Sequence, residues 1–352
     1  MKDFGKILKK ERVKLNKTLF EVSINLGIDS AIISKIERGL RMATRKQVIL
    51  FIQEYQLSEK EAFSYWLADK ILYEIGDEFY IKEAFAVAES KINYLSKSVE
   101  YPDEIQGLIQ KVDGFYQIWS KKKPLDKTQL LKMKEFFNVE NTFQSNLIEG
   151  NTLTLQETHL VVNEGLTISG KSMNEHLEAI NHYEALDYIV EVVQNKVPIS
   201  ERIVKEIHYL ILKGIDRKNA GVYRSVPVYI SGSSHKPPQP YLLAKMMEEL
   251  FEFYENNKHK LHPVILAANM HEKLVTIHPF IDGNGRTSRL LMNLLLLKSG
   301  YPIISLKGDL ESKLNYYKTL EQTQVSENYD PFLILILKTT IESLEQHIEL
   351  CG

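Results

Sequence analysis

The stretch His278-Pro-Phe-Ile-Asp-Gly-Asn-Gly-Arg-Thr-Ser-Arg289 carries most of the information on the fold and chemistry of this chain. Apolar residues recur at helical spacing before it, over residues 261–277, and a dense apolar run follows it to Leu297. Pro279 cannot continue the first helix, and two glycines after it free the backbone for a tight turn. We therefore predict a buried helix, a turn, and a second buried helix that begins near Arg286.

The predicted turn has the composition of a phosphate site. Gly283, Asn284 and Gly285 can direct backbone N–H groups toward one point, and the dipole of the following helix also favours an anion there. Arg286 and Arg289 are three residues apart, so they share a helix face and can hold two phosphates of one polyphosphate.

Two further residues of the stretch add chemistry. Asp282 is a carboxylate beside the phosphate cradle, and Mg²⁺ prefers one or two carboxylates together with phosphate oxygens. The ordinary pKa of a histidine suits proton abstraction near neutral pH, which His278 could perform. A lone histidine before a proline is usually structural, but here base, metal ligand, cradle and paired arginines fall within twelve residues.

The pattern His-Pro-Phe-x-Asp-Gly-Asn-Gly-Arg-x-x-Arg resembles the signature of Fic-domain proteins. The resemblance covers roughly residues 138–352 and implies a mainly α fold that moves AMP from Mg²⁺-bound ATP to a Ser, Thr or Tyr hydroxyl of a target protein, or of itself. It implies that His278 is the general base and that Asp282 holds Mg²⁺. The implied ATP contacts are Gly283, Asn284, Gly285, Arg286, Arg289, Tyr317 and Gln324.

Two departures bear on this resemblance. A Fic relative that acts as a kinase carries Lys where this chain has Gly285, which favours transfer of AMP over transfer of phosphate. The resemblance implies that Gln324 and Tyr317 contact adenine or ribose. Relatives carry Asn where this chain has Gln324, so the match to the family is incomplete at this position. Either tyrosine of the pair at 316–317 could instead belong to the core.

An upstream segment, 143–150, resembles the inhibitory helix of Fic proteins, Ser/Thr-x-x-x-Glu-Gly/Asn. Ser145 and Glu149 are four residues apart and share a face if the segment is helical. A lone Ser-x-x-x-Glu usually marks a solvated helix face. The resemblance implies instead that the Glu149 carboxylate pairs with Arg289 and occupies the place of the γ-phosphate, so that inhibition is internal.

The only clear β signal lies between Gly221 and Pro238, where residues 226–230 are β-rich and 231–234 are turn residues. It resembles the β-hairpin flap of Fic proteins, which pairs with the target's backbone, and the implied docking residues are Val228, Tyr229 and Ile230. A plain surface hairpin is the alternative.

Residues 1–68 read as five short helices. Thr18 can cap a helix that stops at Gly27, and Asp29 or Ser30 opens the next. The stretch 26–39 resembles the XRE/Cro-like helix-turn-helix family. The resemblance implies that Ser30, Ala31, Ser34 and Lys35 face DNA bases and that Arg38 contacts phosphate. Leu19 stands where this family commonly has a Gln that donates to a phosphate, which leaves a protein-interaction or dimer surface open as the alternative.

The whole chain sets further limits. Its 352 residues suffice for more than one core, and residues 69–137 read as a helical bridge between the module and residues 138–352. Residues 1–57 carry a net charge of +6 (12 Lys and Arg, 6 Asp and Glu), against −2 for the chain, which suggests two parts with different partners. The single cysteine and the absence of long apolar runs predict a cytoplasmic protein with no membrane partner.

Two classes of function remain at this stage. The first is an adenylyltransferase with an inhibitory segment, or an enzyme that runs the reverse, de-AMPylating reaction. The second is a DNA-binding regulator whose Fic domain only senses nucleotide. A catalytic histidine favours an enzyme, because a sensor needs no base. A homodimer is open in either case.

Overall fold

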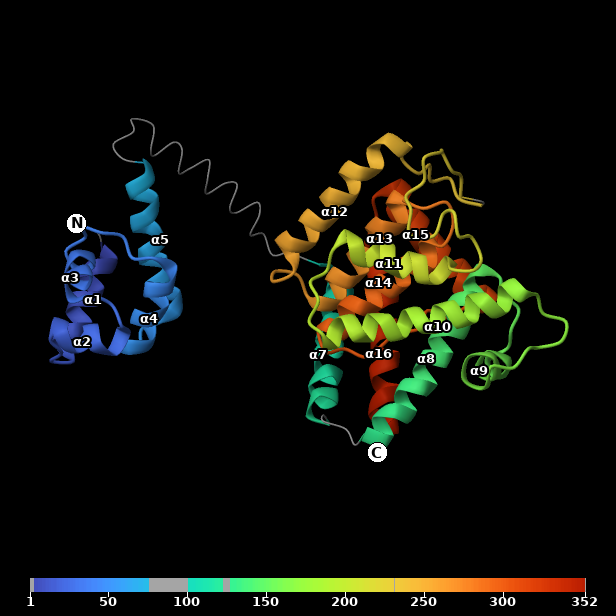
Figure 1. Ribbon diagram of the computed structural model, residues 1–352, viewed down its shortest axis with the longest axis horizontal. Helices are drawn as coiled ribbons and strands as arrows, with labels where there is room; N and C mark the ends of the chain where they lie inside the picture. Colours follow the sequence, from blue (N-terminus) through green and yellow to red (C-terminus); the bar gives the residue numbers. More distant parts are fainter. Residues whose placement is uncertain (1–2, 76–100, 123–126, 231, 352) are drawn as a thin grey trace. The chain divides into compact units, whose positions relative to one another are not determined.

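The computed structural model describes residues 3–75, 101–122, 127–230 and 232–351 (Figure 1). The chain divides into two compact units, Met1–Glu100 and Tyr101–Gly352, which are considered separately below.

The first unit is a small helical module. Its helices are α1 (Asp3–Lys14), α2 (Leu19–Leu26), α3 (Ser30–Glu37), α4 (Arg45–Tyr55) and α5 (Glu59–Ile75). Leu8, Val22, Ile33, Val48 and Phe51 have no exposed surface and form its core. Because each helix contributes an apolar stripe at helical spacing, five short helices can share one core.

Local signals set the boundaries of these helices. Thr18 caps α2 through the N–H of Glu21, and Gly27 ends it in the left-handed region. Asp29 caps α3 through the N–H groups of Ala31 and Ile32. The α1–α3 contact is close, since a Cβ on Gly5 would lie 2.4 Å from the carbonyl oxygen of Ile36.

The second unit is a helical body built around two adjacent helices, α13 (Pro263–Ile277) and α14 (Asn284–Lys298). Both are buried on nearly every side, α13 mainly by apolar residues and α14 by an apolar second half that follows a polar first turn. The surrounding elements are α7 (Asp103–Lys121), α8 (Lys127–Glu149), α9 (Leu155–Glu164), α10 (Met173–Gln194), α11 (Glu201–Leu212), the 3₁₀ turn η1 (Pro240–Leu242), α12 (Leu243–Asn257), α15 (Leu310–Ser326) and α16 (Asp330–Leu350) (Figure 1).

The mainly α fold is confirmed, and the two buried helices lie where they were predicted. The second begins at Asn284, two residues earlier than expected. The predicted bridge of residues 69–137 is shared between the units: α5 ends in the first, whereas α7 packs against α16 in the second. Residues 76–100 and 123–126 of that bridge lie outside the described residues.

The structure contradicts the predicted β-hairpin. In the described part of segment 222–239 no residue is assigned to a strand, and bends fall at residues 225–226. Pro227, Pro237 and Pro238 lack the N–H groups that a hairpin ladder needs. The segment is instead a loop whose two ends are tied together by Arg224, which donates to the carbonyl oxygens of Val226 and Pro238.

A search of the described helices for a membrane span found none that is both long enough and apolar enough.

Candidate active site

His278 is held by its backbone at the end of α13. It caps the helix in the left-handed region, with φ of 51°, and donates its N–H to the carbonyl of Leu274. Its own carbonyl accepts a hydrogen bond of 2.8 Å from Nε of the buried Arg224. The imidazole Nδ1 lies 3.2 Å from the carbonyl oxygen of Val275. Because a carbonyl only accepts, Nδ1 carries the proton and the lone pair is on Nε2.

Burial lowers the pKa of His278, and the nearby charge of Arg224 acts in the same direction, whereas the hydrogen bond that the ring donates to the Val275 carbonyl raises it. The ring is therefore neutral at pH 7, which is the state that a general base requires.

The turn after His278 is closed by side chains of its own. The Asn284 amide accepts from the N–H of Phe280 and donates to its carbonyl, both at 2.9 Å. The Phe280 ring is fully buried and stacks on His208, with the ring centroids 3.6 Å apart. His208 also connects the turn to α11, since its Nδ1 accepts from Gly221 and its Nε2 donates to the carbonyl of Asp282. Burial lowers the pKa of His208 to about 4, so this ring is also neutral.

The N-terminus of α14 has the features of an anion site. Gly283 is its N-cap, in the left-handed region and with no side chain to cap the first N–H groups. Arg286 is buried in the first turn and pairs with two carboxylates, at 3.1 Å from Glu178 and 3.4 Å from Asp282. The Asp282 side chain itself is 69% exposed, which leaves it available to a ligand.

Glu149, at the end of α8, reaches this helix terminus. Its Oε1 lies 2.6 Å from Nη2 of Arg289, whose side chain is only 5% exposed. Ser145 holds the same guanidinium, accepting at Oγ from Nε and at its carbonyl from Nη2, both at 3.0 Å. A Cβ on Gly285 would lie 2.5 Å from the Glu149 carboxylate, so a larger residue there would have to displace that carboxylate.

Opposing effects act on the pKa of Glu149. Desolvation raises it, but the charges of Arg289, Arg286 and Lys313 outweigh that effect and the pKa is lowered. The carboxylate is therefore ionised at neutral pH and puts a negative charge beside the uncapped end of α14.

The remaining predicted residues lie around this centre. Tyr317 is half-exposed and donates to the carbonyl of Ile148, so it contacts the segment that carries Glu149. Gln324 donates to Thr276 on the last turn of α13. In the loop, Tyr229 is 87% exposed and Val228 and Ile230 are partly buried, while His235 and Ser234 attach the loop to Thr276 and Glu321.

Sequence reasoning missed how three residues support the site. Arg224 holds both His278 and the loop ends, Glu178 holds Arg286, and His208 holds Asp282. Arg224 had one usable signal in the sequence, since it is the only Lys, Arg, Asp or Glu in residues 221–235; the structure buries it.

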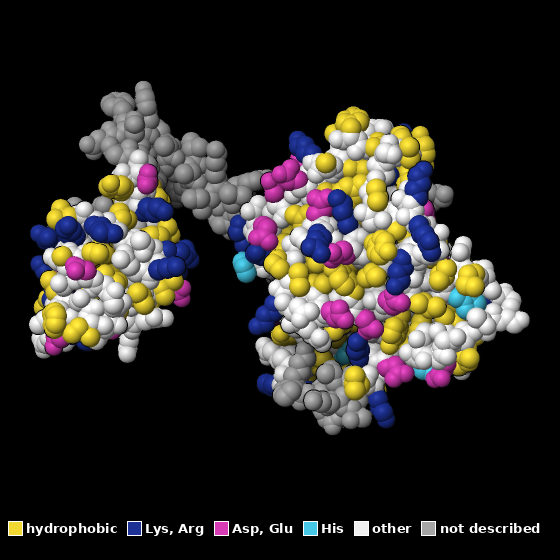
Figure 2. Space-filling model, in the orientation of Figure 1, with side chains coloured by type: hydrophobic (Ala, Val, Ile, Leu, Met, Phe, Trp, Pro, Cys, Tyr) yellow, Lys and Arg dark blue, Asp and Glu magenta, His cyan; other side chains and the backbone are white. Residues whose placement is uncertain are grey.

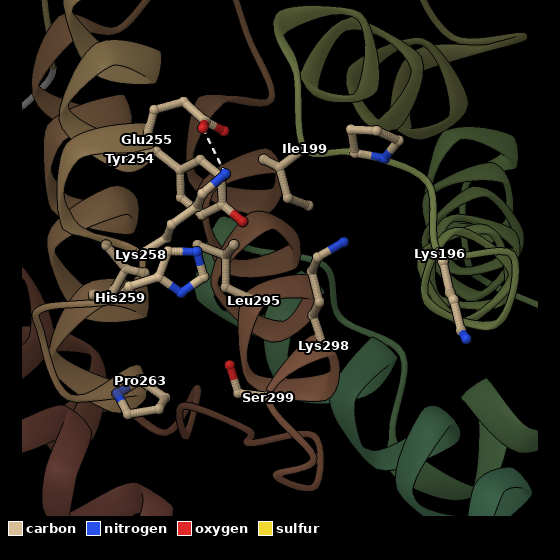
Figure 3. A pocket seen from close by; sticks show the side chains of 12 residues that line it. Lys196, Ile199, Tyr254, Glu255, Lys258, His259, Pro263, Leu295, Lys298 and Ser299 are labelled. Carbon is tan, nitrogen blue, oxygen red and sulfur yellow. Dashed lines mark hydrogen bonds and ion pairs between the residues drawn. The ribbon is translucent and has the colours of Figure 1, made fainter. Parts of the chain in front are cut away.

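A separate pocket of about 420 Å³ lies between the ends of α10, α12 and α14 (Figure 3). Lys196, Lys258 and Lys298 gather around it. Three helices end here, and cations are favoured at the negative ends of their dipoles. Lys298 also donates to the carbonyl of Val197, and Lys258 pairs with Glu255. Two of the three lysines thus have partners within the chain.

A histidine at a helix end, an uncapped helix N-terminus and two buried arginines together form a site whose charge suits an anion. Residues 198–296 match the model of the Fic/DOC family. A crystal structure of a Fic domain containing signaling protein from Bacteroides thetaiotaomicron is 31% identical, with a TM-score of 0.64, and the match covers 68% of this chain and 96% of that one. The chain belongs to the Fic/DOC family.

Curated relatives match a larger part of the chain. A protein adenylyltransferase Fic from Drosophila erecta is 34% identical over 281 residues, or 78% of this chain. The match covers 55% of that relative, so the chain spans about half the length of the curated relatives it matches. Fic-1 from C. elegans, at 23% identity and a TM-score of 0.62 over 94% of this chain and 96% of that chain, shares the fold.

Proposed function

We propose that the second unit is a protein adenylyltransferase: it transfers AMP from ATP to a Ser, Thr or Tyr hydroxyl of a target protein, or of itself. The observation that carries this proposal is the arrangement of a neutral His278 before an uncapped helix N-terminus that is flanked by Arg286 and Arg289. The resemblance to curated adenylyltransferases over 78% of the chain supports the reaction class.

In the proposed reaction the target hydroxyl oxygen attacks the α-phosphorus of ATP. The P–O bond to the β-phosphate breaks, pyrophosphate leaves, and the hydroxyl proton passes to Nε2 of His278. Free N–H groups at the start of α14 and the Arg286 guanidinium balance the charge of the phosphates. Asp282 brings one exposed carboxylate to this site, which fits Mg²⁺, and the ion would supply positive charge to the phosphates.

No group of three metal-binding side chains occurs among the described residues. Protein ligands alone therefore supply few contacts to Mg²⁺, and the ion would be held mainly together with the nucleotide, as is usual for phosphate-transfer sites.

Glu149 keeps the resting site inactive in this proposal. Its carboxylate pairs with Arg289 and brings a negative charge to the end of α14, where it would repel the γ-phosphate. The pair is partly buried, with Glu149 still 31% exposed, so ATP can reach the carboxylate but cannot use Arg289 while the pair is intact.

The experiment uses ATP that is radioactively labelled at the α-phosphate and measures how much label is incorporated into protein. Glu149→Gly is expected to raise incorporation into protein by about 10²-fold, by analogy with the effect of single charge-stabilising groups. Glu149→Gln is the matched control, because it keeps the side-chain length and removes the charge; it is expected to activate as well. Equal labelling by wild type and Glu149→Gly would contradict an inhibitory role of Glu149.

Removal of AMP from a modified target is the second candidate for this site. The observation that favours it is the position of an ionised Glu149 beside the phosphate cradle, where a carboxylate can orient water. Incubating a pre-labelled target with wild type separates the two: loss of label that depends on both Glu149 and His278 would support hydrolysis.

For the first unit we propose binding of duplex DNA. The exposed basic residues between α3 and the start of α4 are Lys35, Arg38, Arg41, Arg45 and Lys46. Lys and Arg side chains, drawn in dark blue, are frequent on the face of this unit that Figure 2 shows. Ala31 is exposed and Ser30 and Ser34 are partly exposed on α3, as base contacts require.

One feature of α2 favours a protein surface instead. Phe20 and Ile24 are 69% and 66% exposed and lie one turn apart, next to Leu19. Gel shifts with genomic fragments at two salt concentrations decide between these alternatives. Binding that weakens steeply with salt supports the DNA proposal, and its absence at both concentrations contradicts it.

A further inference from the structure

Arg224 is a buried cation that forms no ion pair with any Asp or Glu that the structure describes. It is 3% exposed, and burial lowers its pKa without an opposing effect from a carboxylate. Arg286 and Arg289, the two buried arginines of α14, are each paired with a carboxylate. Because removing a charge from water costs several kcal/mol, an unpaired buried guanidinium is a candidate for a specific role.

The hydrogen bonds of Arg224 go to backbone carbonyls. Its Nε donates to the carbonyl oxygen of His278 at 2.8 Å, Nη1 to that of Val226 at 3.1 Å, and Nη2 to that of Pro238 at 2.6 Å. Its backbone N–H donates to the carbonyl of Pro279 at 3.0 Å. A guanidinium can hold several carbonyls at once because its N–H groups form a rigid planar fork, whereas the ammonium of a lysine donates from one point.

Two of these bonds fix the start of the turn that follows α13. His278 has a φ of 51°, in the left-handed region that costs a residue with a Cβ roughly 1–2 kcal/mol. The carbonyls of His278 and Pro279 accept from the side chain and the backbone of Arg224, respectively. Since this backbone carries the imidazole, the direction in which Nε2 points depends on how Arg224 holds it.

The other two bonds fix the loop that was predicted to be a hairpin. They hold its two ends, at Val226 and Pro238, and Ser234 attaches the far part of the loop to Glu321. The residues proposed to dock a target, 228–230, lie between these attachments. One side chain therefore contacts both the backbone of the proposed base and the ends of the segment proposed to hold the substrate.

We propose that Arg224 is a positioning residue for adenylyl transfer, which sets the distance between Nε2 of His278 and a target hydroxyl held by the loop. The inference rests on the function proposed above. The hydroxyl proton can pass to Nε2 only within hydrogen-bond reach, and a misplacement of about 1 Å can lower the rate about 10²-fold. The proposed ATP contacts lie on α14, so binding of ATP does not depend on Arg224.

Arg224 also places a positive charge near the imidazole. Burial lowers the pKa of His278, the charges of Arg224 and His235 lower it further, and the charge of Glu149 and the hydrogen bond to Val275 raise it. Removing the charge of Arg224 should therefore raise this pKa, whereas removing only its planar fork should not. Arg224→Gln and Arg224→Lys separate the two effects.

The test compares variants of the full chain that carries Glu149→Gly. Arg224→Lys keeps the charge and loses the fork, and Arg224→Gln loses both. Arg202→Gln, which removes an 84% exposed arginine of α11, is the matched control. With ATP labelled at the α-phosphate, kcat for AMP incorporation into protein should fall about 10²-fold in both Arg224 variants. The KM for ATP and its affinity by calorimetry should stay within about twofold, and Arg202→Gln should match its parent.

A second measurement does not depend on activity. The pKa of His278 is followed by NMR titration of ¹³C-labelled histidine, and its signal is the one of ten that His278→Ala removes. This pKa should be higher in Arg224→Gln than in the parent and unchanged in Arg224→Lys. A residue that only stabilised the fold would lower the melting temperature without this difference. If Arg224→Gln is unfolded at the assay temperature, the kcat of Arg224→Lys decides.

Two results would overturn the proposal. One is AMP incorporation by folded Arg224→Lys within about threefold of its parent, against the expected 10²-fold loss. The other is an equal pKa of His278 in folded Arg224→Gln and its parent. A complete lack of incorporation by the Glu149→Gly parent would instead contradict the proposed adenylyltransferase, and the titration would still decide whether Arg224 acts on His278.

Discussion

Helices α3 and α14 both begin after a short turn, but a local side chain accepts hydrogen bonds from the first N–H groups only in α3. In α3 the cap is local: Asp29 accepts from Ala31 at 2.8 Å. In α14 the N-cap is Gly283, which has no side chain, and the nearby carboxylate is Glu149 from another helix. The difference teaches that a local cap serves stability, whereas a carboxylate supplied from elsewhere can leave and so control what binds.

The largest expected effect concerns His278, the proposed base before the N-terminus of α14. In the Glu149→Gly background, His278→Ala is expected to lower AMP incorporation by about 10²–10⁴-fold, because the variant lacks the imidazole that is proposed to take the hydroxyl proton. Labelling with α-phosphate-labelled ATP measures it. Binding of ATP should persist in this variant, since the arginines and the helix terminus are untouched; activity that survives the change would remove His278 from the proposed mechanism.

The pH dependence of the rate tests the same proposed role of His278 as general base. Only neutral His278 can accept a proton, so the rate falls about tenfold per pH unit below its pKa and is level above it. Burial lowers that pKa from 6.5, so the midpoint of the acid limb should lie below pH 6.5. The profile of kcat/KM for Glu149→Gly measures it, and a midpoint above 6.5 would mean that the ring is not buried as described.

A third test asks whether Glu149 occupies the α14 terminus. Gly285→Ala places a Cβ 2.5 Å from the carboxylate, so it should lower the free energy of unfolding by about 1–3 kcal/mol. In the Glu149→Gly background the carboxylate that the new Cβ would crowd is absent. The loss in free energy of unfolding caused by Gly285→Ala should therefore be smaller by about 1 kcal/mol. Denaturant titrations of the four proteins give the coupling, and strictly additive effects would show that the two residues are not in contact.

The smallest expected effect belongs to the local cap. Asp29→Ala should lower the stability of the first unit by about 1 kcal/mol, and Asp29→Asn, which can still accept, should lose less. Thermal unfolding followed by circular dichroism measures both. Neither change should alter AMP incorporation by Glu149→Gly; a loss there would contradict a purely local role.

Much of the site could be predicted because it is local in sequence. His278, Asp282 and the two glycines sit within one turn, and the end of α13 follows from Pro279 alone. The loop of residues 222–239 could not be predicted in the same way. Its β-rich residues needed a partner strand to become a strand, and Arg224 supplies side-chain contacts in place of one. The sequence predicts a helical bridge over residues 69–137, but which helix α7 packs against, α16, follows only from the tertiary structure.

The sequence by itself determined the helices, their caps and the residues around the phosphate cradle, because these depend on neighbours a few positions away. Only the tertiary structure decided that Glu149 lies against Gly285 and that Arg224 holds His278. Contacts of this kind join residues that are far apart in the chain, and they follow from how helices pack rather than from any local pattern.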